Sequence, residues 1–252
     1  MKQDEWKKFV KARNRFRKTV DELTLSLPKL KKIQQKLADS REGKNSSYTV
    51  ETPVVYNSSL DDVTEGDEIK LILVADNPGR REQAAENRRY LVGPSGKIAK
   101  KFFCDNPALG VDFSANVIIL NKTPIHSPRT VELRELCRLE KEVGGHSIAA
   151  ALEESQRTMA SLLLEFQQAL LSPVWITGYS EMKKGGIFEI YTESLKELYA
   201  GSKNLYKQIF FYRHFSMNQF TIDLKQQTLA EETVEKTLKR IGAAYRERIL
   251  KI

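Results

Sequence analysis

The chain has 252 residues, of which 40% are hydrophobic and 29% are charged, as in an ordinary globular protein with a sizeable core. Its apolar runs are far shorter than the roughly 18 residues of a membrane-spanning helix, and its charged N-terminus lacks the apolar segment of a signal peptide. Cys104 and Cys137 are too few for a disulfide framework and match no zinc pattern. We therefore expect a cytoplasmic protein with no metal and no membrane partner.

The net charge of +8 is concentrated in the first fifth of the chain. Residues 1–50 contain 14 Lys or Arg and 6 Asp or Glu, whereas the remaining residues contain 27 of each kind. A basic segment beside a neutral body is typical of proteins with a polyanionic partner. A solvated helix face would have the same composition, so both interpretations stay open.

An amphipathic pattern predicts two N-terminal helices, at about residues 3–24 and 27–40. Pro28 fits the first turn of the second helix, capped by Ser26. Polar residues 41–47 then form a linker. We accordingly divide the chain into a basic helical extension, 1–47, and a main domain, 48–252. The apolar stripe of the extension consists of Trp6, Phe9, Phe16, Val20, Leu23, Leu27, Leu30 and Leu37.

Four short apolar segments predict the buried strands of a parallel sheet. Helical patterns alternate with these segments, and Gly144-Gly145 ends one of the predicted helices. The alternation predicts an α/β fold, with three α/β/α layers, a mainly parallel four-stranded central sheet and an N-terminal helical hairpin or arm. The strands are expected at 71–75, 116–120, 174–177 and 208–212, and the main helices at 94–103, 131–142, 148–170, 188–200 and 229–248.

Polar side chains follow three of the predicted strands. Asp76-Asn77 follows the first, Asn121 the second and His214 the last. Because parallel strands end at the same edge of a sheet, we expect these side chains to converge on one site. The segment 93–96, at the start of a predicted helix, could bind a phosphate-sized anion, or it could be an ordinary turn. His126-Ser127-Pro128-Arg129 is expected to be a surface turn.

Four motifs in this order resemble those of the uracil-DNA glycosylase superfamily. They are Ala75-Asp76-Asn77-Pro78-Gly79, Leu91-Val92-Gly93-Pro94-Ser95-Gly96, Asn121 and His214-Phe215-Ser216, within about residues 68–220. The resemblance implies an enzyme of base excision repair, which hydrolyses the N-glycosidic bond of uracil or a related damaged base flipped out of DNA. We separately expect a monomer. Superfamily members with an iron–sulfur cluster use four cysteines, and this chain has two, so we expect no cofactor.

The resemblance also implies a role for each matching residue. Asp76 or Asn77 would hold the attacking water, and His214 would donate a hydrogen bond to the leaving base. Asn121 would read the base edge, because its amide offers both a donor and an acceptor. Leu91 stands where an aromatic residue usually stacks on the base, and Tyr90 or Phe102 could replace it. The expected phosphate contacts are Gly93, Ser95, Gly96 and Ser216, and the expected wedge into the DNA stack is Phe215 or Met217.

Two other functions are compatible with the sequence. One is a nucleic-acid-binding protein on the same scaffold that lacks catalysis, since the stacking aromatic residue is replaced. The other is an α/β enzyme that handles a nucleotide or phosphosugar. A fold alone does not choose among these functions.

Overall fold

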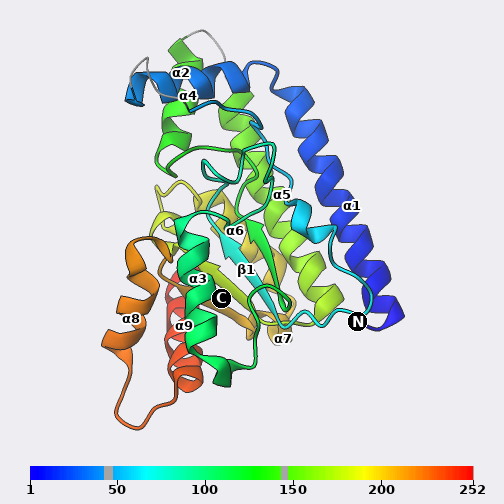
Figure 1. Cartoon of the computed structure of the whole chain (residues 1–252), viewed down its shortest axis with the longest axis vertical. Coiled ribbons are helices and arrows are strands. Elements are labelled where there is room, and N and C mark those ends of the chain that lie inside the picture. Colours follow the sequence, from blue (N-terminus) through cyan, green and yellow to red (C-terminus); the bar gives the residue numbers. More distant parts are fainter. Residues whose placement is uncertain (43–47, 143–146, 252) are drawn as a thin grey trace.

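The computed structural model describes residues 1–42, 48–142 and 147–251. In these ranges the strands β1 (Leu71–Ala75), β2 (Val117–Asn121), β3 (Val174–Thr177) and β4 (Ile209–Tyr212) form one parallel sheet in the order β2-β1-β3-β4. Helices cover both faces of this sheet (Figure 1). The predicted three-layer α/β/α fold is therefore confirmed. Arg41 and Glu42 of the predicted linker at 41–47 belong to a helix, Leu30–Glu42. The rest of this linker, 43–47, and the break at Gly144-Gly145 lie outside the described residues.

The register of the sheet brings the ends of the strands level. Ala75 pairs with Asn121, and Thr177 pairs with Tyr212. All five residues of β1 are buried, as expected for the centre of a parallel sheet with both faces covered. The residues that follow the strands consequently emerge together at one edge.

Two sets of helices form the outer layers. The face that carries Trp175 is covered by α3 (Pro94–Asp105), α8 (Gln219–Gln227) and α9 (Val234–Leu250), with Phe103 and Phe220 stacked on the Trp175 ring. The other face is covered by α5 (Ser147–Leu170) and α6 (Glu189–Tyr199). Two more helices lie at the ends of the layers, α4 (Glu132–Glu142) beside α2 (Leu30–Glu42), and α7 (Lys203–Tyr206) before β4. The last helix that we predicted, at 229–248, corresponds to α9, whereas α8 was not predicted.

The N-terminal extension contains the two helices that we predicted, α1 (Gln3–Ser26) and α2 (Leu30–Glu42). The apolar stripe of α1 packs on α5 and belongs to the same hydrophobic core as the sheet (Figure 1). Ion pairs of Arg15 with Glu165 and of Arg17 with Asp61 attach its polar sides. Ser26 does not cap α2, because its hydroxyl donates to the Leu23 carbonyl in the last turn of α1 at 2.9 Å. Part of the basic charge of this segment is thus paired within the molecule.

His126 is completely buried, so the prediction of a surface turn at this position is wrong. Its Nδ1–H donates to the carbonyl of Pro78 at 2.8 Å, and its Nε2 accepts from the Tyr48 hydroxyl. From α2, Gln34 donates to the His126 carbonyl at 2.8 Å. His126 therefore joins the segment after β2 to the turn after β1 and to α2. No helix in the described part of the chain has the length and hydropathy needed to cross a bilayer.

Burial should make the stability contributed by His126 depend on pH. Desolvation lowers its pKa from 6.5 to about 4, with the Pro78 carbonyl opposing the shift. Between these pH values His126 is protonated in the unfolded chain and neutral in the folded protein, so unfolding takes up a proton. The free energy of unfolding therefore has its full value above pH 6.5 and falls by up to about 3 kcal/mol as the pH drops through 4. We expect the difference in unfolding free energy between wild type and His126→Gln to shrink over this range in urea titrations. A constant difference would contradict the assignment.

Candidate functional site

A cleft of about 620 Å³ opens at the end of the sheet where the carboxyl ends of its parallel strands lie. Segments that follow all four strands contribute to its lining. The structure thereby brings together three residues that the sequence placed at strand ends, Asp76, Asn77 and His214. Leu91, Gly93 and Ser95, which precede or begin α3, line the same cleft.

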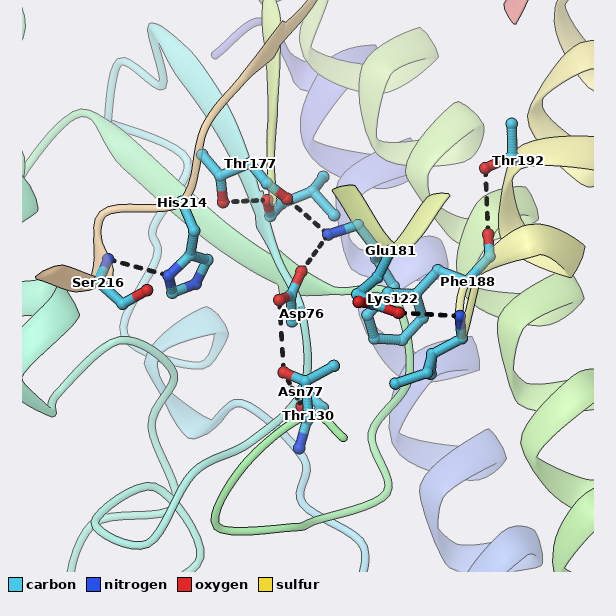
Figure 2. Close-up of polar contacts among 12 residues, drawn as sticks. Asp76, Asn77, Lys122, Thr130, Thr177, Glu181, Phe188, Thr192, His214 and Ser216 are labelled. Atoms are coloured by element: carbon cyan, nitrogen blue, oxygen red, sulfur yellow. Dashed lines mark hydrogen bonds and ion pairs between the residues drawn. The ribbon is translucent and has the colours of Figure 1, made fainter. Parts of the chain in front are cut away.

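Asp76 is held by a lysine that the sequence analysis did not select. The ammonium of Lys122, the residue after β2, lies 2.5 Å from Asp76 Oδ1 and 2.6 Å from the Thr177 carbonyl oxygen at the end of β3 (Figure 2). The Lys122 side chain is fully buried, and its ammonium lies 5.0 Å from the centre of the Phe188 ring. Burial lowers the pKa of Lys122, and the charge of Asp76 opposes this effect. The position of Lys122, two residues after the predicted strand at 116–120, was the available signal.

The Asp76 carboxylate fits its place only because residue 178 is glycine. Gly178 has φ +76°, a left-handed conformation that disfavours side chains. A Cβ atom at this position would lie 2.5 Å from Asp76 Oδ1. The end of β3 therefore provides both a carbonyl for Lys122 and room for the carboxylate.

His214 is fixed in one tautomer. Its Nδ1 accepts a hydrogen bond from the backbone N–H of Ser216 at 3.0 Å, so the proton of the neutral ring is on Nε2 (Figure 2). Desolvation lowers the pKa of His214; the nearby Asp76 raises it and Lys122 lowers it. The neutral imidazole can thus offer an N–H donor in the cleft.

The amide of Asn77 is occupied by the neighbouring loop. Its nitrogen donates to the carbonyl and the hydroxyl oxygens of Ser127 at 3.1 and 3.0 Å, and its oxygen accepts from Thr130 at 3.1 Å. Asn77 therefore fastens the turn after β1 to the segment after β2. Asp76 and Asn77 were the two residues expected to hold a water. Of these, Asp76 has the more available acceptor, because its Oδ2 makes only a long contact of 3.4 Å with Thr130 Oγ1.

Three residues in or just before α3 differ from expectation. Gly96 is buried outside the cleft lining, where a Cβ atom would overlap the Leu91 carbonyl, so its role is close packing rather than phosphate contact. Tyr90 is 2% exposed and its hydroxyl donates to the Val55 carbonyl at 2.6 Å, which leaves its ring inside the core. Phe102 also lies in the core, against Phe103 and Phe220.

A buried glutamate connects the two loops on this side of the cleft. Glu82 accepts hydrogen bonds from the backbone N–H of Gly79 at 3.0 Å and of Leu91 at 2.9 Å. Desolvation raises its pKa to about 7, although both N–H donors favour the ionised form. Leu91, with φ +53°, is thereby held in a strained conformation at the wall of the cleft. No pattern in the sequence had indicated a role for Glu82.

The turn after His214 separates the two expected wedge residues. Phe215 is 1% exposed and stacks on Phe220 with ring centres 4.3 Å apart, so it is not available for insertion into DNA. Met217 is 78% exposed and adopts φ +51° at the tip of the turn. Ser216 lines the cleft and also orients His214.

Asn121 is buried next to the cleft. Its strand partner Ala75 lines the cleft, and paired residues of parallel strands point to the same face of the sheet. Asn121 is 1% exposed, and neither atom of its amide has a hydrogen-bond partner among the described residues. A buried amide without partners is costly, which makes Asn121 a candidate for ligand contact after a small local rearrangement.

The entrance of the cleft is rich in positive charge. Arg80, Arg81 and Arg129 are exposed residues that line it, together with the first residues of α3. The Arg129 guanidinium also pairs with Glu132 at 2.8 Å, and that of Arg80 lies over the Tyr48 ring. A helix N-terminus and arginine side chains both favour anions. Among the described residues, no group of three or more His, Cys, Asp or Glu side chains is arranged to hold a metal ion.

Adding a methyl group at position 178 should test how tightly the Asp76 carboxylate is confined. Gly178→Ala incurs about 1–2 kcal/mol for the left-handed conformation and about 1–3 kcal/mol more for overlap with the carboxylate. The matched control is Gly110→Ala, because Gly110 has φ +65° with nothing within 4 Å of an added Cβ. We expect denaturant unfolding to show the larger loss for Gly178→Ala. Equal losses would mean that the carboxylate is not confined.

Comparison of the chain with protein-family models, with curated proteins and with solved structures found no match. The resemblance to the uracil-DNA glycosylase superfamily therefore rests on the four motifs themselves. Residues from three of these motifs line one cleft, and the fourth motif, Asn121, lies beside it.

Proposed function

We propose that this cleft hydrolyses the N-glycosidic bond of uracil, or of a related damaged base, in a nucleotide flipped out of DNA. The observation that carries the proposal is that two groups line one cleft. They are a neutral His214 fixed as an Nε2–H donor and an Asp76 carboxylate held by Lys122. Cleavage of this bond develops negative charge on the leaving base and positive charge on the sugar. A fixed donor and a fixed anion stabilise these two charges respectively.

The proposed reaction assigns one role to each group. The bond between C1′ and the base nitrogen breaks, and its electron pair leaves with the base while His214 donates to the base oxygen that gains charge. A water molecule donates a hydrogen bond to Asp76 Oδ2, and its oxygen forms the new bond to C1′. The proton lost by the water ends on the released base. Because Oδ1 is held by Lys122, Oδ2 is the carboxylate oxygen turned toward the water.

The remaining contacts follow the shape of the cleft. We assign base recognition to Asn121, whose amide has a donor and an acceptor without partners. Leu91 would pack against the base where related enzymes use an aromatic ring. Gly93, Ser95, Ser216 and the arginines of the entrance would contact the DNA phosphates, and the exposed Met217 would occupy the gap left by the flipped nucleotide.

The positive entrance also favours a second candidate, an enzyme that acts on a small nucleotide or phosphosugar. Three arginines around one cleft suit a single phosphorylated molecule as well as a polymer. The two functions differ in their dependence on length. A DNA glycosylase requires flanking nucleotides, whereas an enzyme for small molecules does not.

Removal of either reacting group should abolish most of the activity. The assay is single-turnover base release from labelled oligonucleotides that carry one uracil, in single-stranded and in mismatched duplex form. We expect His214→Ala and Asp76→Asn each to lower the rate by about 10²–10³-fold, because each removes a charge-stabilising contact. Asp105→Asn, the same substitution at the far end of α3, is the matched control and should retain the wild-type rate.

Each other outcome has a definite meaning. Product that persists in both variants would reveal a contaminating enzyme. Tight binding of DNA without base release from uracil or other lesions would leave a binding protein. Activity on free nucleotides that does not increase with polymer length would favour the second candidate.

The arginines of the entrance should contribute binding that does not depend on base sequence. Arg81→Gln removes one charge beside the cleft, so we expect weaker binding of all oligonucleotides and a slope of log K against log salt that is smaller by about 1. Lys8→Gln makes the same charge change on the exposed side of α1 and serves as the control. Fluorescence anisotropy at several salt concentrations measures both. An equal effect of Lys8→Gln would move the DNA contact to α1.

A further inference from the structure

We infer that Lys122 is a positioning residue of the proposed reaction, which fixes the Asp76 carboxylate toward the cleft and places a compensating positive charge beside Asp76 and His214. This inference rests on the proposed function. It adds a residue that lies outside the cleft and acts through the two groups that line it.

The geometry shows how Lys122 can set the orientation of Asp76. Lys122 follows β2, binds the carboxylate that follows β1, and is anchored on the Thr177 carbonyl at the end of β3 (Figure 2). One ammonium thus ties the ends of three adjacent strands. Lys122 is 0% exposed and is not part of the cleft lining, so it cannot touch the substrate or serve as a nucleophile.

A purely structural role explains this lysine poorly. Burial of an ion pair is unfavourable, and replacing both of its members by apolar side chains of similar volume is often neutral or stabilising. The environment of Lys122 includes the apolar ring of Phe188, which an apolar residue would also contact. The feature that an apolar residue could not supply is the charge next to Asp76.

The charge of Lys122 also acts on His214. Asp76 and Lys122 have opposite effects on the imidazole, since the carboxylate favours its protonation and the ammonium disfavours it. The other charged groups that line the cleft are Arg80, Arg81, Arg129 and Glu82. Without Lys122, Asp76 would lose the ion pair that it forms among the described residues, and its charge would act on His214 without this compensation. The imidazole would then be protonated more easily and would lose the neutral state that the reaction needs.

Kinetics of four variants test this role. They are Lys122→Met, Asp76→Asn, the double variant, and Lys70→Met as the control. Lys70 also contacts a carbonyl and a carboxylate, those of Gly110 and Glu68, but it lies before β1 at the opposite edge of the sheet. We expect Lys122→Met to lower the single-turnover rate by about 10²-fold or more. The Kd for DNA should stay within about threefold of the wild-type value, and the acid limb of the pH–rate profile should move to higher pH. Lys70→Met should leave the rate and the profile unchanged.

The double variant shows whether Lys122 acts through Asp76. If it does, adding Lys122→Met to Asp76→Asn causes little further loss of rate, because the group it positions is already gone. If Lys122→Met alone fails to fold, the double variant can still be compared with Asp76→Asn, because it removes both charges of the pair and leaves no unpaired buried charge. A further loss as large as that of the single variant, or a single variant that behaves like Lys70→Met, would overturn the inference.

An NMR titration of the His214 ring measures how the charge of Lys122 affects the pKa of His214, and it does not depend on catalytic activity. The protein has three histidines, and the resonance that disappears in His214→Ala identifies the ring. We expect Lys122→Met to raise the pKa of His214, whereas Lys70→Met leaves it in place. An unmoved pKa would overturn the role of Lys122. An inactive wild type would instead overturn the proposed function, so the two failures are distinguishable.

Discussion

The arrangement of this protein around its cleft depends on one buried charge. The ammonium of Lys122 lies where β1, β2 and β3 end and is compensated by the Asp76 carboxylate and the Thr177 carbonyl. A buried ammonium is tolerated only when it is paired, so the ends of these strands are held at fixed distances from one another. Gly178 completes the arrangement because it leaves room for the carboxylate.

The walls of the cleft are held by similar contacts between segments that are distant in sequence. Glu82 joins the turn after β1 to the loop before α3, and Asn77 joins the same turn to the segment after β2. Ser216 fixes the tautomer of His214 through its backbone N–H. A site built in this way is rigid before a ligand arrives, which suits a reaction whose barrier is lowered mainly by preorganised charges.

The N-terminal helices illustrate how far a pattern in the sequence can be interpreted. The spacing of apolar residues predicted two helices, and α1 and α2 begin and end within about three residues of these predictions. The surplus of basic residues suggested a polyanion, but Arg15 and Arg17 pair with acidic residues of the main domain. Periodicity depends on local geometry, whereas the fate of a surface charge depends on which residues the fold places opposite it.

The sequence by itself determined the parallel sheet, the helices on both faces and the convergence of Asp76, Asn77 and His214, because strand and helix periods are local and parallel strands share a carboxyl edge. Only the tertiary structure decided which side chains remain available for chemistry. In this structure Phe215 and Tyr90 lie in the core, and the Asn77 amide is hydrogen-bonded to a neighbouring loop. Lys122 and Glu82, which were not predicted from the sequence, bind the residues that line the cleft. Burial and hydrogen-bond partners arise between segments far apart in the chain, so no local pattern encodes them.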